Sequence, residues 1–156
     1  MKALLSLVAV AGFALSAPAQ FYPYAVSPTG TQAGIGYDAA GPHAAVKPAG
    51  GAVSLLTDPA GYAVQAVYCI SSNDAFVGGT AAGWFTAGGG GWLFTTYGTV
   101  PVTWDTGTKA PRVRADVLPM FTFTSTVDAV NPDGSGAGRA WTLFSPFSPT
   151  PISWGP

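Results

Sequence analysis

The stretch that decides the fold is Gly83 to Tyr97, which reads Gly-Trp-Phe-Thr-Ala-Gly-Gly-Gly-Gly-Trp-Leu-Phe-Thr-Thr-Tyr. Two aromatic segments flank four glycines, a pattern that is typical of a β-hairpin. We place its loop at Ala87 to Gly90. On that placement the hairpin has three bulky cross-strand contacts: Phe85 with Trp92, Trp84 with Leu93, and Phe94 over Gly83. Both faces then carry bulky apolar groups, so we expect both to be covered and the hairpin to be central to a two-layer β fold.

Strand signals extend over residues 51–144, with turns about every 8 to 12 residues and no segment that carries a helical stripe. This pattern predicts an all-β fold, a single-domain antiparallel β-sandwich of Ig-like or jelly-roll-like type. Residues 53–56 and 62–70 are expected to pair as a hairpin across a type I turn at 58–61, which has proline second and glycine fourth. Pro101 cannot donate a ladder hydrogen bond, so it predicts an edge strand.

Three further segments flank this β domain. Residues 1–19 combine a short positive start, an apolar run too short to span a bilayer, and a small-residue cleavage site, which is the pattern of a secretory signal peptide. Residues 20–50 are rich in glycine and proline without periodicity and predict an irregular arm. Residues 145–156 predict a proline-rich extended tail. We therefore expect an exported protein that is secreted, extracellular or attached to the cell surface, with the periplasm as a further possible location.

The charge pattern limits the classes of partner. Residues 20–156 carry five basic side chains and seven aspartates, and the sequence has no glutamate. It lacks the basic footprint of nucleic-acid binders, and beyond the signal peptide no apolar run is long enough to span a membrane. Charged residues make up 8% of the chain, against about 25% in ordinary soluble domains, so the surface must be mostly uncharged. Such a surface favours self-association or attachment to a glycan or matrix.

Cysteine and histidine each occur once. Because Cys69 has no second cysteine to pair with in this chain, its thiol is either buried or available for an intermolecular bond. The apolar neighbours Val67 and Ile70 favour burial. His43 lies in the arm next to Pro42, where we interpret it as a solvated side chain rather than a general base or a metal ligand.

Asp105, Thr106 and Gly107 form a triplet that resembles the Asp-Thr-Gly motif of aspartic proteases. The resemblance covers these three residues and implies that Asp105 is a catalytic carboxylate. That chemistry needs a second carboxylate about 3 Å away, and no later segment of the chain supports one. An Asp-x-Gly sequence between strands is also ordinary turn chemistry. We therefore prefer a turn and keep a small hydrolase that uses Asp105 as the alternative.

The loop at residues 131–136 resembles part of a calcium-binding loop. However, Ala129 occupies the first ligand position, and Pro132 stiffens the middle of the loop. Two oxygen side chains fall short of the roughly six to eight ligands that calcium takes. The sequence therefore predicts a polar turn here, with no metal site and no cofactor.

The five tryptophans are candidates for a platform on which sugar rings stack. A β-sandwich uses several of its aromatic side chains inside the core, so only the remainder can bind a ligand. Trp104, on the expected edge strand, and Trp154, in the tail, are the best placed for exposure. A carboxylate beside an exposed ring can also accept hydrogen bonds from sugar hydroxyls. The candidate binding residues are therefore Trp104, Asp105 and Trp154.

These patterns together favour an exported, non-enzymatic β domain that acts by binding or assembly, as a component of a surface, matrix, filament or adhesin. Two alternatives are a small secreted hydrolase using Asp105 and a small outer-membrane β-barrel. The barrel needs strands of about 9–11 residues with an unbroken apolar outer stripe. Pro101 and Pro119 interrupt the candidate strands.

Overall fold

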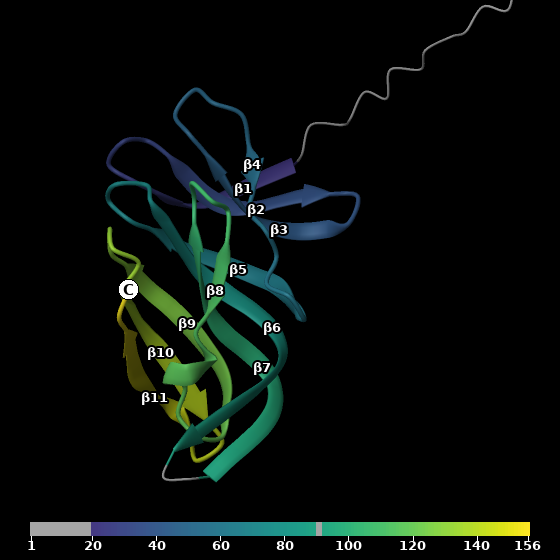
Figure 1. Cartoon of the computed structure of the whole chain (residues 1–156), viewed down its shortest axis with the longest axis vertical. Helices are drawn as coiled ribbons and strands as arrows, with labels where there is room; N and C mark the ends of the chain where they lie inside the picture. The colour runs from purple at the N-terminus through teal and green to yellow at the C-terminus, as the bar shows by residue number, and fades with distance from the viewer. Residues whose placement is uncertain (1–19, 90–91) are drawn as a thin grey trace, which may run out of the picture.

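The computed structural model describes residues 20–89 and 92–156, and this part of the chain is built almost entirely from β-strands (Figure 1). The all-β prediction is therefore confirmed. The predicted signal peptide at residues 1–19 and the two glycines at 90 and 91 lie outside the described residues. Within the described residues, no helix has the length and apolar character needed to cross a bilayer.

The strands form three antiparallel sheets that occupy successive parts of the chain. The N-terminal sheet contains β1 (Gln20–Val26), β2 (Gln32–Asp38), β3 (Gly41–Lys47) and β4 (Ser54–Leu55). The central sheet contains β5 (Tyr62–Ile70), β6 (Phe76–Gly89), β7 (Trp92–Asp105) and β8 (Pro111–Val113). The C-terminal sheet contains β9 (Thr122–Val130), β10 (Gly136–Thr142) and β11 (Ser145–Trp154), and the short 3-10 helix η1 (Ala115–Val117) connects β8 to β9.

The sheets pack as layers around one continuous core. The C-terminal sheet contacts the central sheet through β9, which packs on β6 and β7, and the N-terminal sheet packs on β5 (Figure 1). The core cluster draws Ile35, Val67, Val102 and Val127 from all three sheets. In every sheet, hydrogen-bonded neighbours are also consecutive in the sequence. The architecture is sandwich-like as predicted, but its connections are meanders rather than the Greek keys of Ig-like and jelly-roll folds.

The aromatic hairpin is present as β6 and β7, but its register differs from the prediction by four residues. Trp84 pairs with Tyr97 and Ala87 with Phe94, and the ladder continues to the pair Gly89 and Trp92. The connection is therefore two residues long, the length that hairpins favour most, especially with glycine. A loop at residues 87–90 would leave ladder hydrogen bonds unformed. Because the difference is an even number of residues, each side chain still lies on the predicted face.

The two faces of this hairpin differ in how they are covered. Phe85 and Ala87 are buried on the inner face, where β9 crosses the hairpin. The crossing is so close that a Cβ atom on Gly98 would lie 2.2 Å from the carbonyl oxygen of Phe123. On the outer face, Trp84 and Tyr97 are exposed. The expectation that both faces are covered is therefore wrong for this part of the hairpin.

Residues 20–50 form β1, β2 and β3 rather than an irregular arm. Glycine and proline hide the strand pattern there, yet each has a place in the sheet. A Cβ atom on Gly34 would lie 2.0 Å from the carbonyl oxygen of Tyr22, so the close pairing of β1 and β2 needs glycine at that position. Pro23 lies on an edge strand, where a missing donor is tolerated. The predicted boundary between arm and domain therefore falls inside a folded region.

The hairpin predicted from residues 53–56 and 62–70 does not form. β4 pairs with β3 in the N-terminal sheet, whereas β5 pairs with β6 in the central sheet. A turn does lie between them, since the N–H of Tyr62 donates to the carbonyl of Pro59 at 3.0 Å and Gly61 has a φ of +82°. Turn residues thus indicated where the chain bends, but not which strands pair.

Pro101 lies inside β7, between β6 and β8, so the edge-strand prediction is wrong. Pro101 is opposite Thr80 of β6, but its carbonyl accepts a hydrogen bond from the N–H of Arg114 at 2.9 Å. The N–H and C=O of a strand residue point to the same side. The donor that proline lacks would therefore point away from β6, and the β6–β7 ladder loses nothing.

The tail is extended, as predicted, but it is not outside the β domain, because it forms β11 at the edge of the C-terminal sheet. The guanidinium of Arg114 donates to the carbonyl of Gly155 at 2.9 Å, which holds the end of the tail against the segment that follows β8.

The loop at residues 131–136 is a polar turn, also as predicted. Within it, the N–H of Gly134 donates to the carbonyl of Asn131 at 3.0 Å.

Candidate functional site

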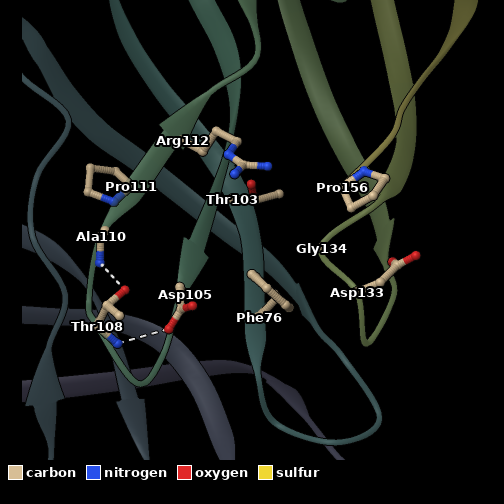
Figure 2. Close-up of a pocket in the computed structure, with 10 residues that line it drawn as sticks. All are labelled: Phe76, Thr103, Asp105, Thr108, Ala110, Pro111, Arg112, Asp133, Gly134 and Pro156. Carbon is tan, nitrogen blue, oxygen red and sulfur yellow. Dashed lines mark hydrogen bonds between the residues drawn. The ribbon is translucent and has the colours of Figure 1, made fainter.

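Asp105 lies on the wall of a cavity of about 320 Å³ at the end of the central sheet that carries the β7–β8 turn; we call it the turn-end cavity. Figure 2 shows Asp105 and Arg112 on one side, with Asp133 and Pro156 across from them. The complete lining is Phe76, Thr103, Asp105, Thr108, Ala110, Pro111, Arg112, Asp133, Gly134 and Pro156. The cavity therefore combines two carboxylates, one guanidinium, hydroxyl groups and an aromatic ring.

The carboxylate of Asp105 closes the turn in which it lies. Its Oδ1 accepts hydrogen bonds from the N–H groups of Gly107 at 2.9 Å and Thr108 at 2.8 Å. The hydrogen bond from Thr108 is the largest influence on the pKa of Asp105, and together with that from Gly107 it holds this pKa below the ordinary value, although burial opposes it. Asp105 is therefore ionised near neutral pH, and the Asp-Thr-Gly triplet acts as turn chemistry. Its proposed role in a hydrolase stays a prediction.

Asp133 has a similar local role on the opposite side of the cavity. Its Oδ1 accepts hydrogen bonds from the N–H and the hydroxyl of Ser135, at 2.9 and 2.7 Å. These bonds hold the pKa of Asp133 below its ordinary value. Arg112 makes no ion pair within 4.0 Å among the described residues. A general acid at neutral pH needs a raised carboxyl pKa, and neither carboxylate of this cavity has one.

The two tryptophans predicted to bind are buried. Trp104 has no exposed surface, and Trp154 is 6% exposed. The indole N–H of Trp104 donates to the carbonyl of Thr57 at 2.9 Å, and that of Trp154 donates to the carbonyl of Gly134 at 3.2 Å. The expectation that these rings are exposed is wrong. Since a stacking platform needs an exposed ring face, both tryptophans hold the surrounding chain in place instead.

The most exposed tryptophan among those whose side chains are described is Trp84, which lies on the outer face of the β6–β7 hairpin. We define this outer face by Trp84 and Thr86 of β6 and by Leu93, Thr95 and Tyr97 of β7. Trp84 is 67% exposed, Leu93 80% and Tyr97 57%. The rings of Trp84 and Tyr97 meet edge to face, 5.7 Å apart at 73°, and the hydroxyls of Thr86 and Thr95 are hydrogen-bonded at 2.9 Å.

Sequence reasoning missed this face because it assumed cover on both sides of the hairpin. The sequence does contain a signal for this face, because large apolar residues alternate with threonine along one side of each strand. These residues are Trp84 and Thr86 in one strand and Leu93, Thr95 and Tyr97 in the other. Threonine between large apolar residues on one strand face indicates partial solvation, whereas the opposite face of β6 carries Phe85 and alanine. The outer face carries no charged side chain.

His43 is not solvated, contrary to the prediction. Its side chain is 14% exposed, its Nε2 lies 2.9 Å from Oδ1 of Asp38, and its Nδ1 lies 2.9 Å from Oδ2 of Asp58. The ring thus links the β2–β3 hairpin to the segment between β4 and β5. Burial lowers the pKa of His43, but the hydrogen bonds and charges of the two carboxylates outweigh burial and raise it above the ordinary value of 6.5.

Replacing His43 with glutamine is expected to destabilise the protein more at about pH 6 than at about pH 8.5. Because the pKa is raised by folding, the charged ring contributes its full stabilisation below the unfolded pKa of about 6.5. This contribution is lost as the pH rises through the folded pKa. Urea unfolding of the parent and of His43→Gln across this pH range gives the free energy of unfolding of each protein. In the difference between the two, the contributions of titrating groups that both proteins share cancel. A difference that stays constant or grows with pH would contradict the prediction.

Cys69 is half-buried on β5, and its thiol lies 3.9 Å from the carbonyl oxygen of Gly78 as a weak donor. Burial raises the pKa of the thiol to about 11. The thiolate is the reactive form, so the thiol is mostly unreactive at neutral pH. This environment fits the inert alternative better than the intermolecular disulfide.

Among the described residues, no group of three or more His, Cys, Asp or Glu side chains is arranged to hold a metal ion. Several ionisable side chains instead pair with each other or close turns, as in the bidentate contact of Arg139 with Asp128 at 2.8 and 3.0 Å. Comparison with known proteins finds no matching family model, no matching curated protein and no matching solved structure.

Proposed function

We propose that this protein is an exported, non-enzymatic β domain that acts by binding or assembly, as a component of a surface, matrix, filament or adhesin. The observation that carries the proposal is the outer face of the β6–β7 hairpin, where Trp84, Leu93 and Tyr97 are exposed together. Contiguous exposed apolar groups with a polar surround are characteristic of interaction surfaces. Tryptophan and tyrosine also contribute most to binding at protein interfaces.

The partner that suits the outer face best is another protein surface, including a second copy of this chain. The near-perpendicular rings of Trp84 and Tyr97 form a ridge, which can insert into a partner but does not offer one flat plane for a sugar ring. The low charge of the chain, 8% of residues, provides little repulsion between copies. The alternative partner is a glycan or a matrix polymer, and separate sedimentation measurements distinguish a protein partner from a polysaccharide.

The double variant Trp84→Ser with Tyr97→Ser is expected to weaken binding by at least about tenfold, or about 1.4 kcal/mol. Sedimentation of residues 20–156 over a range of concentrations measures self-association, and co-sedimentation with insoluble polysaccharides measures glycan binding. Phe147→Ser is the matched control, because Phe147 is 98% exposed but lies on β11, away from the outer face.

Both variants should keep the thermal unfolding temperature of the parent within a few degrees, since the altered rings are exposed. Equal weakening by Phe147→Ser would show that general hydrophobicity, and not the outer face, drives association. A protein that stays monomeric and binds no polysaccharide would contradict the proposed function.

A further inference from the structure

A second cavity lies where four connections of the fold meet, and it shares no lining residue with the turn-end cavity. We call it the Asp74 cavity. Its volume is about 380 Å³, and its lining consists of Thr31, Val46, Pro48, Ala52, Ser54, Asp74 and Thr106. These residues come from β3, from β4 and from the β1–β2, β3–β4, β5–β6 and β7–β8 connections. The cavity is therefore formed jointly by the N-terminal and central sheets.

The carboxylate of Asp74 is only half satisfied by the protein. Its Oδ2 accepts hydrogen bonds from the hydroxyls of Thr29 and, at 2.8 Å, Thr31. Its Oδ1 is shielded from solvent and has no hydrogen-bond partner among the described residues. A buried charged acceptor without a donor is destabilising, so such an atom requires an explanation. Asp74 has a φ of +63°, a left-handed conformation that aspartate adopts more readily than most residues, and its N–H closes a turn on the carbonyl of Ser71.

Two of the three hydroxyl donors on the cavity wall, those of Thr31 and Thr106, are already in use, and the third belongs to Ser54. The hydroxyl of Thr31 donates to Asp74, and that of Thr106 donates to the backbone carbonyl of Asp74 at 2.6 Å. What these groups still offer is acceptor capacity, namely the remaining lone pairs of the Asp74 carboxylate and of the two hydroxyl oxygens. No basic side chain lines the cavity. The wall therefore suits a group that brings both donors and positive charge.

A protonated amine fits this wall better than a metal ion. A calcium ion needs about six to eight oxygen ligands, whereas the cavity has one carboxylate and no cluster of three metal-ligating side chains occurs in the described residues. An ammonium group brings three donors and one charge. Val46, Pro48 and Ala52 supply an apolar surface on which methylene groups can lie.

We propose that the Asp74 cavity binds an alkylammonium group, with Asp74 as its counter-ion and Thr31 and Thr106 as additional acceptors. The same chemistry is presented by the lysine side chain of a protein partner and by a free polyamine. This site is separate from the outer face of the β6–β7 hairpin, so each proposal can fail without the other.

The direct test is a titration of the protein with n-butylammonium, followed through the backbone amide NMR signals of Thr31, Ser54 and Asp74. We expect saturable shifts that n-butanol, which has the same stem without the charge, does not produce. Nα-acetyl-lysine methylamide and putrescine then distinguish the two sources of the ligand. Tighter binding of the lysine derivative indicates the side chain of a protein partner, and tighter binding of putrescine indicates a free polyamine. Calcium chloride tests the metal alternative.

Three variants locate the binding. Asp74→Asn removes the counter-ion, and Ala52→Leu narrows the cavity at an exposed position while leaving the carboxylate unchanged; both should weaken butylammonium binding by at least about tenfold. Asp133→Asn alters a carboxylate of the turn-end cavity and should bind like the parent. If Asp74→Asn does not fold, Ala52→Leu alone decides the question.

Four results would overturn the proposal. They are equal shifts with butanol, unchanged affinity in Ala52→Leu, calcium shifts that saturate at the same residues, and no saturation up to about 10 mM butylammonium.

Discussion

Replacing Trp104 with alanine is expected to lower the free energy of unfolding by about 3–5 kcal/mol, the range for deleting a large buried ring. Trp104 has no exposed surface, belongs to the shared core, and donates its indole N–H to the carbonyl of Thr57. The variant loses the packing of the ring and leaves that carbonyl without its donor. Urea unfolding followed by circular dichroism measures the change through the midpoint and slope of the transition.

Trp84→Ala is the matched control, since it deletes the same ring at a position that is 67% exposed. Its cost should be about 1 kcal/mol or less, mostly from the edge-to-face contact with Tyr97. Losses of equal size in the two variants would mean that Trp104 is not a core residue and would reopen its role as an exposed binding residue.

A chain that begins at Gly51 is expected to lose cooperative folding altogether. It lacks β1, β2 and β3, and with them the buried side chains of Ile35 and Val46. Burial of one such side chain stabilises by about 1.5–3 kcal/mol, and whole domains are stable by only about 5–15 kcal/mol. The truncation also exposes the part of β5 on which this sheet packs.

Thermal unfolding and sedimentation of the truncated chain, compared with residues 20–156, test this expectation. A broad or absent transition with aggregation is the expected result. A sharp transition near that of residues 20–156 would show that the N-terminal sheet is an independent appendage. Loss of assembly with an intact fold would instead make that sheet the element that joins copies.

Periodicity in the sequence predicted the faces of the central hairpin but not its register. The aromatic residues around Trp84 and Leu93 alternate strongly, which defines two faces, and an even error in the pairing leaves those faces unchanged. The register depends on which glycines form the turn. Four identical residues in succession offer several equivalent turns, and the ladder selects the shortest one that completes its hydrogen bonds.

The N-terminal sheet was missed for a different reason. Gly34 and Gly36 have no side chain with which to display alternation, and Pro23 and Pro42 are ordinarily read as breaks. Contacts with neighbouring segments decide these positions: a Cβ atom on Gly36 would lie 2.4 Å from a methyl carbon of Leu55. Such restraints arise from segments far apart in the sequence, so no local pattern reveals them.

The candidate site could be predicted only in part. Asp105 closes the turn that the Asp-x-Gly pattern predicted, but the sequence could not show that it also lines a cavity. Trp104 was expected at an edge because Pro101 lies in the same strand. However, the side of Pro101 that lacks an N–H donor faces the end of β8. The strand can therefore stay in the interior of the sheet, with the indole of Trp104 buried. Asp74 carried no sequence signal, because its environment is built by four separate connections.

The meander topology has a consequence for how the chain folds. Its three sheets use residues 20–55, 62–113 and 122–154 without overlap. Every ladder therefore closes between neighbouring segments, which costs little loop entropy and favours faster folding than Greek-key proteins of similar size. During synthesis, the N-terminal sheet can complete its pairing before the central sheet has left the ribosome, and it then offers a preformed apolar surface to β5.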